Sequence, residues 1–272
     1  MEIAKVNGVE LEYEVTGRGE PVLFISSVLA DGFAPLLHHP ELNARYRMMH
    51  YHRRGWAGST HGDGLTTIAD HAADAAALLE FLGVTCAHVA GHSSGAAVAV
   101  QLALDSPRAV HSLILLELSL LSLPEGQAFL ADAGPILERY ESGDHADAFA
   151  AFMTAVSGLE WPACRALLEE RVPGVVDQSI ADAHTFFGVE LPSLARWALD
   201  PPDAAGIRQP VLSVRGTGTL PLWVEVAAFL RRCLPHVDEC VVDGAGHLLH
   251  IQRPEPVARG VQRFLERQPM AS

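Results

Sequence analysis

Hydrophobic and polar positions alternate with two different periods along this chain, and together they predict strands interspersed with helices. Alternating runs flank Asn7-Gly8, a pattern typical of a β-hairpin. The uninterrupted apolar run at 22–25 predicts a buried strand. Further strands are predicted at 46–52, 86–91 and 111–116. Two helices lie between them in the prediction.

The first helix is predicted from Thr67 to Phe81. Thr67 and Asp70 have the spacing of a capping box, and Gly83 is placed to end the helix. The second is an alanine-rich helix over 94–105, which ends near Pro107. Strand and helix thus alternate through the first part of the chain, which is typical of a parallel sheet.

The pattern changes after Leu123. Helix-like segments fill residues 125–197, with no convincing strand among them. Strands are again predicted at 210–216 and 238–244, and the helices 222–234 and 254–268 follow them. The prediction is an α/β fold with a mostly parallel sheet and helices on both faces.

The change of pattern also predicts the domain organisation. Residues 1–124 and 198–272 would form the core domain, and 125–197 a helical cap inserted over it. The sequence shows no internal repeat and no low-complexity linker.

Charge and cysteine usage exclude several classes of function. The 272-residue chain carries a formal net charge of −14, which would repel nucleic acid and anionic membranes. The amino terminus lacks the layout of a secretory signal, and no stretch is apolar for long enough to span a membrane. The four cysteines lack C-x-x-C spacing, so neither structural zinc nor a disulfide framework is expected. We therefore expect a cytoplasmic protein.

A candidate nucleophile lies between the strand 86–91 and the helix 94–105. The residues Gly91-His92-Ser93-Ser94-Gly95 form a G-x-S-x-G motif, in which small residues permit a sharp strand-to-helix turn. Ser93 would be exposed at the tip of this turn. The N–H of Ser94 would face a developing oxyanion at the start of the helix.

A serine nucleophile needs a base, and the chain has 14 histidines. His247 is the best candidate because its glycine-bearing loop follows the last strand, at the sheet edge where Ser93 is expected. His250 is the alternative, although packing is its expected role. His92 adjoins Ser93 but should point elsewhere because of the turn. The other histidines are expected to be surface or packing residues.

With these motifs the whole chain resembles an α/β-hydrolase. The resemblance rests on the serine motif, the loop 53–59 (RRGWAGS), the helical segment and the histidine near the end. It implies an eight-stranded sheet, a Ser–acid–His triad in that chain order and no cofactor or metal.

The chain departs from the family pattern at the triad acid. The usual acid follows the strand 210–216, but the turn after it, Gly216 to Pro221, contains no carboxylate. Glu117 ends the strand next to that of the serine, on the same edge, and some family members carry the acid there. Among them are the zearalenone-type lactone hydrolases, which this chain resembles locally. Glu117 is therefore the predicted acid. The alternatives are that it pairs with an arginine, that it caps a helix of the cap, or that Asp243 takes the role.

A second departure concerns the oxyanion hole. Many members have His-Gly after the early strand, whereas this chain has Ser26-Ser27-Val28. A backbone donor needs no particular side chain, so the second N–H is expected from Ser27 or Val28.

These assignments predict a serine hydrolase that cleaves an ester or lactone of a medium-sized hydrophobic substrate. The pocket is expected to include apolar residues of the cap, namely Met153, Trp161, Phe186, Phe187 and Leu191. A C–C bond hydrolase, a perhydrolase and a receptor-like binding protein with slow turnover remain alternatives with the same triad. The sequence does not indicate the natural substrate or the oligomeric state.

Overall fold

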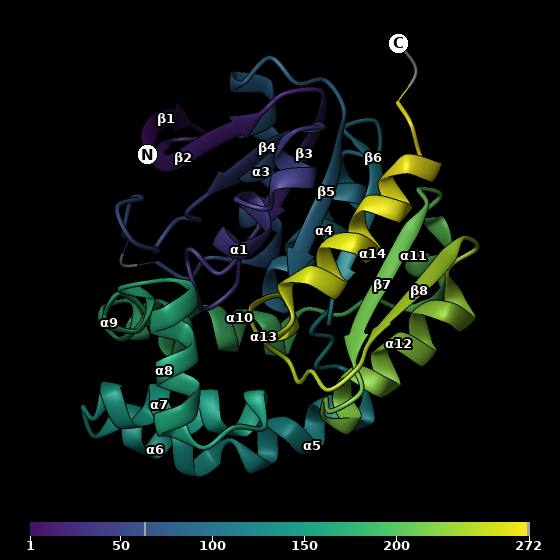
Figure 1. The fold of residues 1–272 in the computed structure, drawn as a ribbon. Coiled ribbons are helices and arrows are strands. Elements are labelled where there is room, and N and C mark those ends of the chain that lie inside the picture. Colours follow the sequence, from purple (N-terminus) through teal and green to yellow (C-terminus); the bar gives the residue numbers. More distant parts are fainter. Residues whose placement is uncertain (63, 271–272) are drawn as a thin grey trace.

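The computed structural model describes residues 1–62 and 64–270, and a single eight-stranded sheet runs through its centre (Figure 1). The strand order is β1-β2-β4-β3-β5-β6-β7-β8. β2 pairs antiparallel with β1 and β4, and every other neighbouring pair is parallel. The predicted α/β class and the mostly parallel eight-stranded sheet are confirmed. The strands are β1 (Glu2–Val6), β2 (Val9–Gly17), β3 (Glu20–Ile25), β4 (Tyr46–Tyr51), β5 (Ala87–His92), β6 (Val110–Leu116), β7 (Val211–Gly216) and β8 (Val237–Val242).

Local sequence signals account for the first elements. Asn7 and Gly8 have positive φ angles of 47° and 77°, as a two-residue hairpin turn requires, and Val6 pairs with Val9 across it. Helix α3 (Ile68–Phe81) begins at the predicted capping box, in which Thr67 and Asp70 cap each other's backbone N–H. The alanine-rich helix is α4 (Ser94–Asp105).

Both faces of the sheet are buried, which explains why its central strands are apolar without alternation. In β3, Leu23 and Ile25 pack on one face, whereas Val22 and Phe24 pack on the other. Helices α3, α4 and α12 (Pro221–Cys233) cover the first face. The second face is covered by α1 (Ala34–Leu37), α2 (Pro40–Asn43) and α14 (Pro254–Arg267).

Between β6 and β7 the chain forms a run of helices, here called the insert, which lies beyond one end of the sheet (Figure 1). The insert extends from Pro124 to Arg196, and its division from the core as a separate domain stays a prediction. Its helices are α5 (Pro124–Asp132), α6 (Gly134–Glu141), α7 (His145–Ser157), α8 (Trp161–Arg171), α9 (Val175–Ala181), the π-helix η1 (His184–Glu190) and α10 (Leu191–Arg196). Two short helices of the core complete the structure, α11 (Pro201–Gly206) and α13 (Leu249–Gln252).

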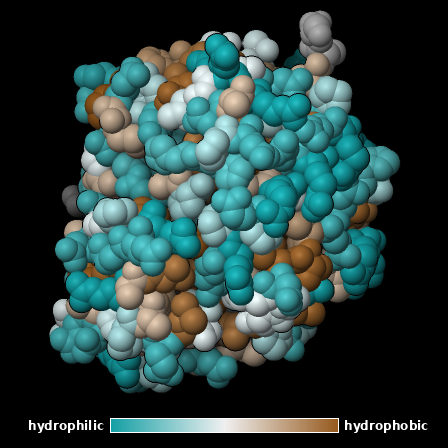
Figure 2. All heavy atoms as spheres, viewed as in Figure 1, coloured by the Kyte–Doolittle hydropathy of each residue, from teal (hydrophilic) through white to brown (hydrophobic). Residues whose placement is uncertain are grey.

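The outer surface contrasts with this apolar interior. Figure 2 shows one face that is mostly hydrophilic, with hydrophobic residues in separate small groups. Within the described residues, no helix is both long and apolar enough to cross a membrane.

Candidate active site

Ser93 occupies a strained turn between β5 and α4. Its φ of 55° and ψ of −120° lie outside the regions that residues with side chains normally adopt. Both motif glycines are required by close packing. A Cβ on Gly91 would collide with the Gly95 carbonyl oxygen, and a Cβ on Gly95 would collide with that of Ile25. The G-x-S-x-G sequence therefore encodes the turn that presents Ser93.

The predicted acid and base are in contact. Glu117 directly follows β6, His247 lies in the loop after β8, and their Oε2 and Nδ1 atoms are 2.8 Å apart. Both side chains are buried, with 0% and 3% exposure. The Trp223 ring stacks on the His247 imidazole, with centroids 3.7 Å apart and planes inclined by 14°. The imidazole is thus fixed at one nitrogen and along one face.

The turn after β7, where the family's usual acid is missing, holds Glu117 instead. The Gly216 N–H donates to Oε1 and the Thr219 hydroxyl donates to Oε2, each over 2.8 Å. The Glu117 backbone has a φ of 46°, a second strained residue at this edge of the sheet. Asp243, the alternative acid, instead accepts a hydrogen bond from the Thr217 hydroxyl at 3.2 Å.

Burial shifts the titration of both partners. It lowers the pKa of His247, so the imidazole rests in the neutral form that a general base needs. Burial raises the pKa of Glu117, and the Gly216 N–H, the Thr219 hydroxyl and the charge of Arg215 act in the opposite direction. With Glu117 ionised as the acceptor, Nδ1 of His247 carries the proton and Nε2 is the free base.

The Ser93 hydroxyl points to a neighbouring serine. Its Oγ lies 3.0 Å from Oγ of Ser119, which is its one hydrogen-bond partner among the residues that the structure describes. Ser93 and His247 nevertheless line the same cavity, of about 20 Å³. This volume holds about one water molecule. Apart from Ser93, Ser94, Ser119 and His247, the lining is apolar: Leu121, Phe129, Phe152, Val156, Phe186, Leu191, Leu194, Leu222 and Trp223.

Two of the five predicted pocket residues, Phe186 and Leu191, line this cavity. The other three, Met153, Trp161 and Phe187, lie outside its lining because they pack within the insert. Met153 is fully buried on α7. Trp161 packs edge-on against Phe149, with centroids 5.9 Å apart, and Phe187 stacks on Tyr140 at 5.3 Å.

The neighbouring histidines support the His247 loop. His92 is directed away from Ser93, as predicted, and its Nε2 donates to the His247 carbonyl oxygen over 2.9 Å. Its Nδ1 lies 3.1 Å from the Ser27 hydroxyl. His250 packs beside His92 and Phe33, with ring centroids 4.2 and 5.1 Å away.

The segment Ser26-Ser27-Val28 lies beside the first turn of α4. The close approach of Gly95 to the Ile25 carbonyl brings the end of β3 against this turn. Ser27 and Val28 are both buried, and the Ser179 hydroxyl of the insert donates to the Val28 carbonyl oxygen over 3.1 Å. The choice between Ser27 and Val28 as donor stays a prediction.

The sequence analysis did not assign a role to four residues that the structure places at the site. Ser119 lies two positions after Glu117, and Thr219 lies in the turn noted only for its missing acid. Trp223 lies in the predicted helix 222–234, and Glu190 lies in the helical segment 125–197, where the sequence gives neither residue a role. Of these, only Thr219 could have been found from the sequence. It occupies the position in the turn where the acid is usual, and a hydroxyl there can donate to a carboxylate that comes from the neighbouring strand.

One group of side chains elsewhere has the composition of a metal site. Ligand atoms of Asp31, His50 and His52 lie within 4.8 Å of one another. However, His52 already lies 2.8 Å from Glu12 through Nδ1 and 2.8 Å from Asp31 through Nε2. Burial is the largest single effect on the pKa of His52 and lowers it. The two carboxylates together outweigh burial, so the pKa is raised. His52 thus bridges two carboxylates, and His50 Nε2 lies beside the Ser26 hydroxyl and the Ala30 carbonyl oxygen, so hydrogen bonds within the protein account for the group.

Comparison with known proteins agrees with this geometry. The family model for the alpha/beta hydrolase fold matches residues 20–254, and the chain belongs to this family. A curated relative, "Putative carbamate hydrolase RutD" from Azorhizobium caulinodans, is 34% identical over 118 residues. That match covers 42% of this chain and 43% of the relative, so it spans less than half of either.

Two solved structures share the fold over nearly the whole chain. A thermophilic esterase from Thermogutta terrifontis has a TM-score of 0.81 at 21% identity and covers 99% of this chain and 100% of its own. The enol-lactonase from Burkholderia xenovorans LB400 also has a TM-score of 0.81, at 20% identity, covering 97% and 100%. Identities this low establish the fold alone.

Proposed function

We propose that this α/β-hydrolase cleaves carboxylic esters or lactones of hydrophobic substrates through Ser93, His247 and Glu117. The observation that carries the proposal is the 2.8 Å contact between His247 and Glu117 beside the cavity that Ser93 lines. A base oriented by a buried acid and a serine on a strained turn are the parts that acyl transfer needs.

The first half-reaction forms an acyl-enzyme. Ser93 Oγ leaves Ser119 by rotation about its Cα–Cβ bond, gives its proton to His247 Nε2 and attacks the carbonyl carbon. The N–H groups of Ser94 and of Ser27 or Val28 stabilise the oxyanion. The imidazolium then protonates the leaving alkoxide, which departs as an alcohol or, from a lactone, stays attached to the acyl chain.

The second half-reaction releases the acid. His247 takes a proton from water, the hydroxide attacks the acyl carbon and the Ser93 oxygen leaves with the proton from the imidazolium. Glu117 holds the ring in one tautomer and stabilises its positive charge in both halves.

The apolar cavity supports a hydrophobic acyl group. Phe129, Phe152 and Phe186 line it together with leucines, and the described lining contains no charged side chain other than His247 when protonated. Its volume of about 20 Å³ cannot hold a medium-sized ester, so side chains or insert helices must move when the substrate enters.

The test is hydrolysis of p-nitrophenyl esters with acyl chains of increasing length, followed by a panel of lactones. Wild-type protein is expected to release p-nitrophenol, and Ser93→Ala should lower kcat by a factor on the order of 10⁴ or more. Ser142→Ala, at an exposed serine of the insert, is the matched control and should keep full activity. Tight ligand binding without turnover by the wild type would instead support a receptor-like protein.

A further inference from the structure

Glu190 is a buried carboxylate of the insert that contacts the core beside Ser93. It is the last residue of η1, and its side chain is 1% exposed. Oε1 accepts a hydrogen bond from the Ser94 hydroxyl over 2.6 Å. Oε2 lies 2.5 Å from Nη1 of Arg53, whose side chain is also 1% exposed. One carboxylate thus joins the insert to two separate segments of the core.

The ion pair is not explained by stability alone. A buried ion pair is expensive to desolvate, and apolar residues of similar volume often replace one without loss of stability. Arg53 also lies over the Trp56 ring, 5.5 Å from its centroid. Among the described residues, Glu190 is the one carboxylate within salt-bridge distance of Arg53. The charge of Arg53 therefore attracts one oxygen of Glu190, while the other oxygen accepts from Ser94.

Ser94 is the residue through which Glu190 can affect chemistry. Its backbone N–H is the proposed oxyanion donor, and it is the first residue of α4. The sheet side of this first helical turn is fixed by the close contact of Gly95 with β3. From the insert, the same turn is restrained by the hydrogen bond that the Ser94 hydroxyl donates to Glu190. The position of the N–H thus depends on a residue of the insert.

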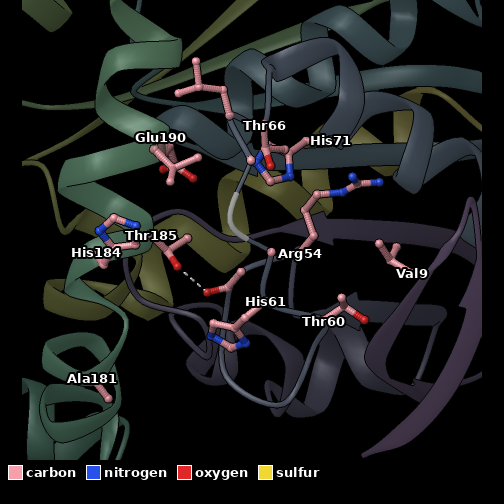
Figure 3. Close-up of a pocket in the computed structure, with 15 residues that line it drawn as sticks. Val9, Arg54, Thr60, His61, Thr66, His71, Ala181, His184, Thr185 and Glu190 are labelled. Atoms are coloured by element: carbon pink, nitrogen blue, oxygen red, sulfur yellow. Dashed lines mark hydrogen bonds between the residues drawn. The ribbon is translucent and has the colours of Figure 1, made fainter.

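The π-helix that carries Glu190 separates two spaces. Phe186 of η1 lines the small cavity beside Ser93. On its other side, His184, Thr185 and Glu190 line a more polar pocket of about 320 Å³, where Thr185 donates to the Gly55 carbonyl oxygen (Figure 3). A rearrangement of η1 that enlarges this small cavity would strain or break the contact between Glu190 and Ser94. Single-turn π-helices occur frequently at functional sites.

We propose that Glu190 is a positioning residue that completes the oxyanion hole only when η1 is seated on the core. Its carboxylate, oriented by Arg53, holds the Ser94 hydroxyl and so places the Ser94 N–H. This inference rests on the proposed serine-hydrolase function and adds to it a residue of the insert.

The test separates the acceptor for Ser94 from the buried charge. Arg53→Met/Glu190→Gln removes the ion pair but keeps an oxygen that can accept from Ser94. Arg53→Met/Glu190→Leu removes the ion pair and the acceptor together. Because both double variants lack the buried charges, their thermal midpoints should be similar.

Two rates are measured on each variant: kcat for a p-nitrophenyl ester, and the rate of labelling of Ser93 by a fluorophosphonate. Labelling joins Oγ to phosphorus, expels fluoride and passes the hydroxyl proton to His247, so it needs no knowledge of the natural substrate. We expect Arg53→Met/Glu190→Leu to be about tenfold slower than Arg53→Met/Glu190→Gln in both rates, with KM changed less than twofold.

Ser94→Ala tests the same hydrogen bond from the other side, without changing Arg53 or Glu190. It keeps the backbone N–H but removes the hydroxyl that Glu190 holds. Added to either double variant, it should bring both to the same rate, about tenfold below that of Arg53→Met/Glu190→Gln. Equal rates for the two double variants, or a fully active Ser94→Ala protein, would overturn the role of Glu190. If wild-type protein neither hydrolyses esters nor is labelled at Ser93, the serine-hydrolase function itself fails and the inference fails with it.

Discussion

The ends of strands β6 and β7 contribute different parts to the contact with His247. After β6, Glu117 supplies the carboxylate that contacts His247. After β7, the turn 216–221 supplies no carboxylate but two donors, the Gly216 N–H and the Thr219 hydroxyl, which both bond to Glu117. The comparison teaches that the position without the acid still serves the site, because a buried carboxylate needs partners for both of its oxygens.

The largest effect is expected from the β6 side. Glu117→Gln keeps the shape but removes the charge, and its amide can present an N–H toward Nδ1 and favour the wrong tautomer of His247. We expect kcat to fall by a factor on the order of 10³ to 10⁴ while the protein remains folded. Ester hydrolysis and circular dichroism measure the two properties, with Asp243→Asn as the matched control. Full activity of Glu117→Gln with an inactive Asp243→Asn would transfer the acid role to Asp243.

Moving the carboxylate back to β7 should recover part of this loss. Thr219 Oγ1 lies 2.8 Å from Oε2 of Glu117, which is the atom that contacts His247. In Glu117→Ala/Thr219→Asp, the new carboxylate is therefore close to the imidazole, and we expect kcat about tenfold above that of Glu117→Ala. Glu117→Ala/Thr219→Asn has the same shape without the charge and should show no recovery. If the Asp and Asn variants were equally slow, the two strand ends would not be interchangeable.

A smaller effect is expected when β7 loses one donor. Thr219→Val removes a hydrogen bond to the carboxylate, which costs about 1.5 kcal/mol or more and lowers kcat by about tenfold. The same donor lowers the pKa of Glu117. Without it the Glu117–His247 pair holds an additional proton more tightly, so the acidic limb of the kcat/KM profile should move to higher pH, by about one unit. A limb that stays in place or moves to lower pH would show that Thr219 does not act on the carboxylate.

The smallest effect is expected at Ser119, which belongs to the same segment as Glu117 and whose hydroxyl is hydrogen-bonded to Ser93. Ser119→Ala removes the 3.0 Å contact between the Ser93 and Ser119 hydroxyls. We expect kcat to change by less than about threefold, because a neutral hydrogen bond contributes about 1 kcal/mol or less and the transition state does not use it. A loss as large as that of Glu117→Gln would instead make Ser119 part of the catalytic machinery.

Much of the fold followed from local sequence signals. The capping box at Thr67, the Asn7-Gly8 hairpin and the apolar runs of the central strands each encode their element within a few residues. The helices α1 and α2 are too short for a helical period to appear in the sequence, and the π form of η1 depends on what packs against it. The sequence also could not predict which apolar residues of the insert line the cavity. Met153 and Phe186 are both apolar residues in helical segments, but only Phe186 lines it.

The sequence by itself determined the strand-to-helix turn at Ser93, the absence of a carboxylate after β7 and the presence of Glu117 at the end of the neighbouring strand β6. Only the tertiary structure decided which atoms hold the Glu117 carboxylate, that Ser119 bonds to Ser93 and that Glu190 reaches Ser94 from the insert. The reason is physical. Turns and periodicity are set by neighbours along the chain, whereas the partners of a buried charge come from segments about 100 residues away, brought together only when the sheet and insert pack.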